Sequence, residues 1–333
     1  MGRNGLEETT KALVAPAKGI LAADESIPTI EKRFKAINLS STSETRRAYR
    51  EMLFTTPGLG EFISGVILFD ETIRQADSAG QPLPKVLQQQ GILPGIKVDK
   101  GAKAMALFPG EKVTEGLDGL RERFKEYREL GARFTKWRAV IGIDQQIPTD
   151  GCLKANAHAL ARFAALSQEA GLVPIVEPEV LMDGSHPLQR CQEVTERTLH
   201  LVFSALVEQR VSFEQMLLKP NMVIAGKACP QQASIPEVAA ATLLTLRRAV
   251  PPAVPGVVFL SGGQNDVLAT EHLNAMNQLG RAPWELSFSY GRALQDAALK
   301  AWNGNNVAAG QQALWSRAKW NSLARREVCA RLN

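Results

Sequence analysis

Short apolar runs alternate with longer amphipathic stretches along almost the whole chain. The apolar runs are nearly continuous rather than strictly alternating, which is typical of parallel strands that are buried on both faces. The runs that predict strands are 19–24, 65–70, 95–99, 134–140, 173–180, 215–221, 257–263 and 286–292.

The segments between these runs place apolar residues at the three- and four-residue spacing of amphipathic helices, most clearly in 119–130, 156–170 and 188–208. Eight strand–helix units predict an α/β fold, a (β/α)8 TIM barrel, with a doubly wound sheet as the alternative. The length of 333 residues fits one large barrel as well as two modest domains. No linker or change of composition marks a boundary, so we expect a single domain over residues 1–333.

The end of the sequence has a helical pattern of its own, in which basic residues accompany Leu314, Trp315, Trp320 and Leu323. This pattern predicts a helical segment over 309–333 that packs on the barrel and is not followed by a long tail. Membrane binding by an amphipathic helix is the alternative use of such a segment.

Composition and charge are those of an ordinary globular protein, with 45% hydrophobic and 22% charged residues. A net charge of +5 favours small anionic ligands, and the scattered Lys and Arg argue against a nucleic-acid partner. No apolar run is long enough to cross a bilayer, and the N-terminus lacks the pattern of a signal peptide. We therefore expect a cytoplasmic protein that has no membrane partner.

The cysteines and histidines do not form a recognisable metal or disulfide pattern. The cysteines Cys152, Cys191, Cys229 and Cys329 are far apart, and no HExxH spacing occurs among the four histidines. We expect reduced thiols and neither a metal nor another cofactor.

Lys219 is the residue with the clearest chemical promise. It follows the apolar run 216–218 and precedes Pro220, so it lies where a strand stops abruptly. Loss of water around an amine favours its neutral form, which can attack a carbonyl group and form a Schiff base. Taken alone, this pattern is more often that of a solvated lysine at a strand end, and the Schiff-base interpretation depends on the rest of the chain.

The ends of the other strands favour a functional site, because barrels carry their chemistry at the carboxyl ends of the strands. Charged residues at or near these ends are Asp24, Lys97, Lys136, Arg138, Glu177, Glu179 and Lys219. Side chains two residues apart on a strand lie on the same face, so Glu177 and Glu179 should point in the same direction. A structural salt bridge would account for any one pair of these charges. Burying so many charges in one barrel mouth is costly, and function is the usual reason for it. Repulsion from Lys136 would also favour the neutral amine of Lys219.

Two further groups of residues suggest anion binding. Strands seven and eight end in Ser261-Gly262-Gly263 and Ser289-Tyr290-Gly291-Arg292, where barrels commonly bind phosphate. Glycine lets backbone N–H groups approach an anion, and arginine can bind phosphate through two hydrogen bonds. A second basic group, Ser26, Thr29, Lys32 and Arg33, follows the first strand. A capped and solvated helix start explains this second group as well.

Taken together, these stretches resemble the class I fructose-1,6-bisphosphate aldolases, the Schiff-base family that needs no metal. The matching stretches are KGILAADES (18–26), GVILF (65–69), GIKVDKG (95–101), TKWR (135–138), VPIVEPE (173–179), LLKPNM (217–222), FLSGGQ (259–264) and SFSYGRALQ (287–295). The resemblance implies a cytoplasmic lyase, usually a homotetramer. Such an enzyme cleaves fructose 1,6-bisphosphate reversibly to dihydroxyacetone phosphate and glyceraldehyde 3-phosphate in glycolysis and gluconeogenesis.

The resemblance also assigns roles to residues. It makes Lys219 the Schiff-base lysine and Glu177 the acid and base for forming the imine, with Glu179 balancing charge. Asp24 would steer the proton of the substrate hydroxyl, assisted by Lys136. A first phosphate site would comprise Ser261, Gly262, Gly263, Ser289, Gly291 and Arg292. A second phosphate site would comprise Ser26, Thr29, Arg33 and Lys97, with Lys32 and Arg138 close by.

The sequence departs from the family pattern at its end. Animal members end in a long tail whose last tyrosine exchanges protons with the enamine, but the tyrosines here are Tyr49, Tyr127 and Tyr290. Three alternatives stay open on these residues: a preference for sedoheptulose 1,7-bisphosphate, a preference for fructose 1-phosphate, and a barrel that serves as a non-catalytic scaffold.

Overall fold

The computed structural model describes residues 3–280 and 282–326. Parallel strands close into a barrel in chain order, and the last strand pairs with the first, with Ile20 opposite Ser289. The barrel strands are β1 (Gly19–Ala23), β2 (Ile63–Leu68), β3 (Leu93–Lys97), β6 (Phe134–Ile141), β7 (Val173–Val180), β8 (Leu217–Leu218), β9 (Gly256–Phe259) and β10 (Glu285–Tyr290). The predicted (β/α)8 barrel is confirmed, and a doubly wound sheet is excluded because the sheet has no open edge.

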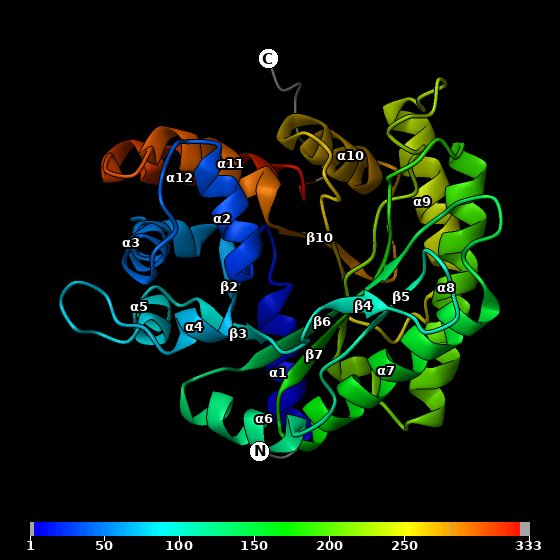
Figure 1. Cartoon of the computed structure of the whole chain (residues 1–333), viewed down its shortest axis with the longest axis horizontal. Helices are drawn as coiled ribbons and strands as arrows, with labels where there is room; N and C mark the ends of the chain where they lie inside the picture. Colours follow the sequence, from blue (N-terminus) through cyan, green and yellow to red (C-terminus); the bar gives the residue numbers. More distant parts are fainter. Residues whose placement is uncertain (1–2, 281, 327–333) are drawn as a thin grey trace.

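Helices surround the barrel (Figure 1). Their bounds are α1 (Arg3–Leu13), α2 (Ile27–Lys35), α3 (Ser43–Phe54), α4 (Asp70–Ile73), α5 (Leu83–Gln89), α6 (Leu120–Glu129), α7 (Asp150–Glu169), α8 (Leu188–Glu208), α9 (Ile235–Ala249), α10 (Asp266–Gln278), α11 (Arg292–Trp302) and α12 (Val307–Leu323). Two short 3₁₀ turns, η1 (Leu59–Glu61) and η2 (Phe213–Gln215), complete the set for the described residues. Helices α7, α8 and α9 pack in succession, and α12 packs against α11 and α3.

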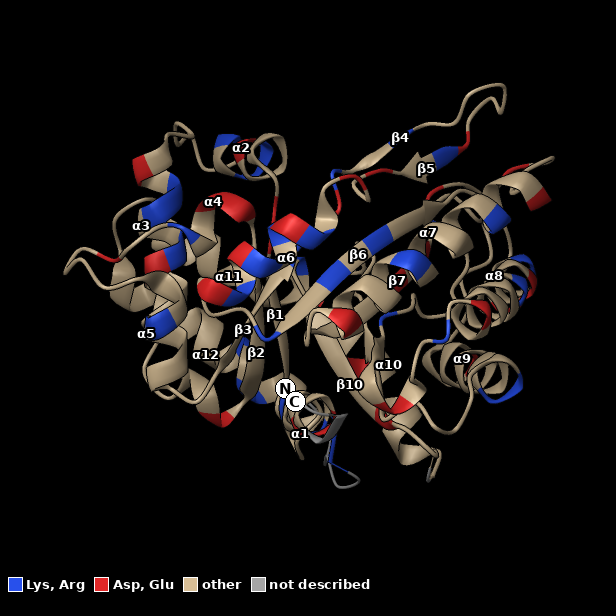
Figure 2. Cartoon of the chain, turned by 90° about the horizontal axis from the view of Figure 1, so that it is seen from below, with Lys and Arg blue, Asp and Glu red and all other residues tan. Residues whose placement is uncertain are grey.

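The structure differs from the sequence prediction outside the barrel, at the ends of several strands and at the final helix. A hairpin of β4 (Ala102–Ala104) and β5 (Lys112–Thr114) stands outside the barrel (Figure 2). Strand β8 has two residues instead of the predicted run 215–221. The final helix α12 begins at Val307, and residues 327–333 of the predicted segment, with Cys329, lie outside the described residues.

The interior of the barrel is filled at the amino ends of its strands. Phe134 is fully buried there, and the end of α1 adds Leu13. Glycines make room for them: a Cβ atom on Gly95 would lie 2.3 Å from the Phe134 ring, and one on Gly65 would lie 2.7 Å from Leu13. Because this end is filled by side chains, the polar residues gather at the opposite end.

Gly95→Ala tests this packing. The added methyl group would have to displace the Phe134 ring, and overpacking of this kind costs about 1–3 kcal/mol of folding free energy. Urea unfolding should show that loss. Gly142→Ala is the matched control, because its Cβ would meet only Ile147 at 3.5 Å. Equal stability of the two variants would show that the interior has room at Gly95.

His272 fixes the loop that follows β9. Its ring is buried, and Nδ1 lies 2.6 Å from the amide oxygen Oε1 of Gln264, so this nitrogen donates the hydrogen bond. Burial lowers the pKa of His272 from 6.5 to about 4. The unfolded chain therefore binds more protons than the folded protein between these two pKa values, and stability falls as the pH drops through that window.

The pH dependence of stability tests the buried imidazole. Between about pH 7.5 and pH 5, His272 should cost the folded protein about 2 kcal/mol. In His272→Gln, unfolding measured at both pH values should show a smaller loss on acidification than in the unaltered protein. Exposed His158→Gln is the control. An unchanged loss in His272→Gln would mean that the His272 ring is protonated in the folded protein.

Candidate active site

A cavity of about 500 Å3 opens at the carboxyl ends of the barrel strands. Nearly all of the residues predicted from the sequence line it: Asp24, Ser26, Thr29, Lys32, Arg33, Lys97, Lys136, Arg138, Glu177, Glu179, Lys219, Ser261, Gly262, Ser289, Gly291 and Arg292. Gly263 is the exception, since it borders a neighbouring cavity of about 380 Å3. The fold therefore brings residues from almost the whole length of the chain into one mouth.

Three buried side chains and the half-buried Asp24 form a row of alternating charge, called here the charged row. Nζ of Lys136 lies 2.6 Å from Oδ2 of Asp24 and 3.3 Å from Oε2 of Glu177. Nζ of Lys219 lies 3.3 Å from Oε1 of the same Glu177. Glu177 thus sits between the two amines, and its negative charge offsets the repulsion between them.

The charged row perturbs proton affinities in both directions. Burial alone would lower the pKa of Lys136, but attraction by Asp24 and Glu177 outweighs burial and the pKa is raised. Burial alone would raise the pKa of Asp24, but the positive charges of Lys136 and Lys219 outweigh burial and the pKa is lowered. Asp24 is therefore a carboxylate and Lys136 an ammonium group at neutral pH.

The local strand geometry explains why these side chains meet. On β6, Lys136 and Arg138 face the mouth while Trp137 stacks outward on Phe163, with ring centroids 5.7 Å apart. The basic bands on β6 are visible in Figure 2. On β7, Glu179 forms an ion pair with Arg138.

Lys219 keeps its place although β8 is short. Its backbone N–H donates to the carbonyl oxygen of Val176 on β7, at 2.8 Å. Pro220 follows and has no N–H to continue the pairing. The carbonyl oxygen of Pro220 accepts a hydrogen bond from the backbone N–H of Leu260, at 3.1 Å, so Lys219 is held by backbone bonds on both sides.

The residues of the first predicted phosphate site lie at the ends of β9 and β10. Gly262 and Gly263 have φ angles of +59° and +83°, which side chains disfavour, so glycine is required in this turn. Ser289 is buried, and its hydroxyl has no partner among the described residues. Gly291 precedes α11, whose N-terminus attracts anions.

The residues of the second predicted phosphate site lie at the start of α2. Oγ of Ser26 and Oγ1 of Thr29 are 3.0 Å apart, and Ser26 makes no side-chain cap bond to the helix. Lys97 reaches the same mouth from β3 and pairs with Asp99 at 2.8 Å.

Comparison with known proteins agrees with this geometry. The family model described as fructose-bisphosphate aldolase class-I matches residues 5–330. The chain belongs to the class I fructose-bisphosphate aldolase family. It is therefore an aldolase, a lyase, by family.

Relatives within this family are similar over nearly their whole length. A protein of Xanthomonas campestris, called probable fructose-bisphosphate aldolase class 1, is 59% identical over 96% of both chains. Fructose-bisphosphate aldolase 1 of Toxoplasma gondii is 54% identical over 96% of this chain and 89% of its own. A solved structure of the Plasmodium falciparum aldolase, in complex with TRAP and a small-molecule inhibitor, superposes with a TM-score of 0.96. It is 52% identical, and the match covers 97% of this chain and 94% of that one.

Two acidic residues that line the cavity, Asp99 and Glu25, were not among the residues predicted from the sequence. Asp99 accepts hydrogen bonds from the backbone N–H groups of Gly101 and Arg138, at 3.1 Å each, besides pairing with Lys97. The sequence feature that could have identified Asp99 is its place at the end of the strand-like run 95–99. The second missed residue is Glu25, which directly follows Asp24.

Glu25 borders the cavity and joins several elements around it. Its carboxylate pairs with Arg33 at 2.5 Å and with Arg50 at 2.6 Å, and it accepts a hydrogen bond from Gln295 at 2.8 Å. Burial alone would raise the pKa of Glu25, but Arg50 and Arg33 outweigh burial and the pKa is lowered. Its charge therefore persists at neutral pH.

Glu25→Ala should destabilise the protein by about 3–5 kcal/mol, because it leaves the buried guanidinium of Arg50 without its carboxylate. Denaturant unfolding measures the loss. Glu44→Ala removes an exposed carboxylate that pairs with Arg47 and should change little. Similar stability of the two variants would show that Arg50 finds another partner.

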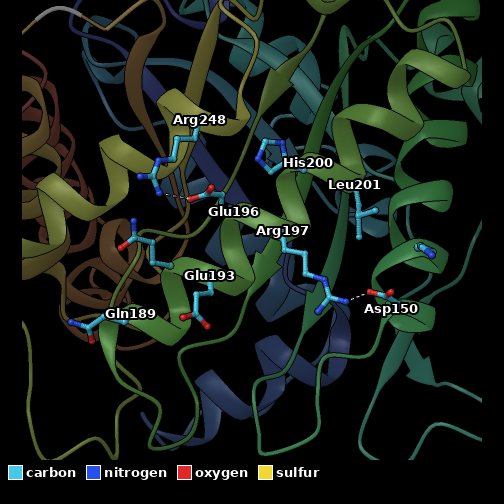
Figure 3. A pocket seen from close by; sticks show the side chains of 10 residues that line it. Asp150, Gln189, Glu193, Glu196, Arg197, His200, Leu201 and Arg248 are labelled. Atoms are coloured by element: carbon cyan, nitrogen blue, oxygen red, sulfur yellow. Dashed lines mark hydrogen bonds and ion pairs between the residues drawn. The ribbon is translucent and has the colours of Figure 1, made fainter.

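A larger cavity, of about 840 Å3, lies outside the barrel beside α7 and α8 (Figure 3). Arg197 pairs with Asp150 there, and Arg248 with Glu196 at 3.3 Å. These four side chains are partly exposed. This cavity lacks the buried, mutually paired charges that distinguish the barrel mouth.

No group of three or more His, Cys, Asp or Glu side chains in the described part of the chain is placed to hold a metal ion. No described helix is both long and apolar enough to cross a membrane. Metal independence stays a prediction. Cys152, Cys191 and Cys229 are free thiols in the described part of the chain.

Proposed function

We propose that this aldolase cleaves fructose 1,6-bisphosphate reversibly through a Schiff base on Lys219, without a metal. The observation that carries the proposal is the buried amine of Lys219, 3.3 Å from the carboxylate of Glu177 at the end of the charged row. The two predicted phosphate sites border the same cavity. A bisphosphate could therefore be held at both ends with its carbonyl group near Lys219.

The first step joins enzyme and substrate. Lys219 passes a proton to Glu177, and the neutral amine attacks C2 of the substrate to give a carbinolamine. Glu177 then protonates the oxygen on C2, which leaves as water. The product is an iminium ion between Nζ and C2. Glu177 suits both transfers because it already contacts Nζ in the resting site.

The second step breaks the bond between C3 and C4. The electron pair moves toward the iminium carbon and gives an enamine, and the hydroxyl group on C4 loses its proton as the aldehyde forms. Asp24 accepts a hydrogen bond from this hydroxyl and then takes its proton, and the lowered pKa of Asp24 keeps it ionised before the step. Lys136, held between Asp24 and Glu177, supports the developing negative charge on oxygen.

The last step releases the second product. The enamine takes up at C3 one proton, which balances the proton lost from the C4 hydroxyl and returns the site to its starting charge. Water then hydrolyses the iminium ion, so that dihydroxyacetone phosphate leaves and Lys219 is restored. The ion pair of Arg138 with Glu179 borders the site and balances its charge.

The family supports further proposals for the chain. We infer a homotetramer of single-domain subunits in the cytoplasm that works in glycolysis and gluconeogenesis and binds no nucleic acid or membrane. The family description names fructose bisphosphate as the substrate. It therefore does not favour sedoheptulose 1,7-bisphosphate or fructose 1-phosphate as the preferred sugar.

Trapping the Schiff base tests the function. The protein is incubated with dihydroxyacetone phosphate, reduced with borohydride and mapped by peptide mass. We expect an adduct on Lys219 and none in Lys219→Ala or Lys219→Arg. The arginine variant keeps a positive charge beside Glu177 but lacks a nucleophilic amine. Both variants should lose at least about 1,000-fold in kcat.

The opposite result is equally clear. Absence of an adduct in the folded, unaltered protein, together with no cleavage of fructose 1,6-bisphosphate, would leave the scaffold alternative. Circular dichroism of each variant separates loss of the nucleophile from loss of the fold. Cleavage that stops on addition of EDTA would contradict metal independence.

A further inference from the structure

Lys227 lies beside the turn that follows β9, although no sequence motif pointed to it. A residue other than glycine at position 263 would direct its Cβ atom toward two cationic groups. That Cβ position is 3.0 Å from Nζ of Lys227 and 3.0 Å from Nη2 of Arg292. Because both distances share one end, the two nitrogens are at most about 6 Å apart.

Lys227 and Arg292 have fewer carboxylates close to them than would balance their two positive charges. Arg292 forms no ion pair with any described residue, and Asp296 on the same helix acts on it only at longer range. Lys227 has one carboxylate nearby, Asp183 at 3.4 Å, and that side chain is 70% exposed. Two cations this close repel each other unless an anion lies near them.

The position of Lys227 is fixed by its backbone. Its N–H donates to the carbonyl oxygen of Met182, at 2.8 Å, and the flanking Gly226 donates to His186 at 2.8 Å. A Cβ on Gly226 would lie 2.3 Å from the carbonyl oxygen of Gly184, so the two loops are in direct contact. The loop after β8 is therefore held against the loop after β7, with its lysine directed at the turn after β9.

We propose that Lys227 is a phosphate-positioning residue that binds the same phosphate group as Arg292. The inference rests on the proposed function and adds a residue to the first phosphate site. Gly263 then has a second role besides its positive φ angle, since any side chain there would fill the space between the two cations. Lysine acts as a point charge on phosphate, while arginine supplies directed hydrogen bonds.

The proposal explains why Gly263 does not line the main cavity. Lys227 and Gly263 both border the neighbouring cavity of about 380 Å3, whereas Arg292 borders the main one. Phosphate bound between them would be held from both sides of the turn. The loops after β8 and β9 and the start of α11 would then share one ligand.

Lys227→Met tests the proposal, because methionine keeps much of the length of the side chain and removes its charge. We expect KM for fructose 1,6-bisphosphate to rise about tenfold, with kcat changed less than about twofold. The inhibition constant of inorganic phosphate should rise by a similar factor. Lys227→Arg should restore most of both. Lys85→Met, on the exposed face of α5, removes the same net charge and should change neither.

Unchanged KM and phosphate inhibition in Lys227→Met would overturn the inference and leave the proposed function intact. An equal effect of Lys85→Met would overturn it too, because net charge alone would then explain the loss. If the unaltered protein did not cleave the sugar, the proposed function would fail instead. The rise in Tm caused by inorganic phosphate, compared between unaltered protein and Lys227→Met, would then decide the role of Lys227 without activity: a smaller rise supports it, and an equal rise overturns it.

Discussion

The position of Glu177 between two buried amines is the interaction on which the site depends. Charges removed from water are costly unless opposite charges lie close, and here each carboxylate of the charged row meets a lysine. The four charged side chains come from β1, β6, β7 and β8 or from the residues directly after these strands. They meet only when the strands pair in the correct register, so the site depends on the closed barrel. A shift of β7 by one residue would turn Glu177 to the outer face and leave both lysines without it.

The barrel meets this requirement by dividing its interior. Phe134 and the glycines opposite it fill the amino end with close-packed apolar atoms. The carboxyl end is left to charged side chains and to turns whose glycines adopt positive φ angles. One layer of the barrel interior is thus packed for stability, and the next layer holds the charged side chains. On β6 the two layers are only two residues apart, at Phe134 and Lys136.

Much of this arrangement could be predicted from the sequence, and the exceptions have physical causes. The run 173–180 was predicted with the bounds of β7, because all of its eight residues apart from Glu177 and Glu179 are apolar. Strand β8 was overestimated because Pro220 ends the pairing inside an apolar run. The β4–β5 hairpin was missed because three-residue strands show no clear periodicity. The candidate site followed from strand ends, but Glu25 did not, since its partners Arg50 and Gln295 are distant in the sequence.

Glu25 also connects the two ends of the mouth. It holds Arg33 on α2, at the second predicted phosphate site, and it accepts a hydrogen bond from Gln295 on α11, the helix that starts at the first. Gln295 bonds in turn to the carbonyl oxygen of Ala22 at the end of β1. The distance between the two predicted phosphate sites is therefore set by a buried connection and not by surface loops. Under the proposed function, this buried connection would select a substrate by the separation of its two phosphate groups as well as by the groups it carries.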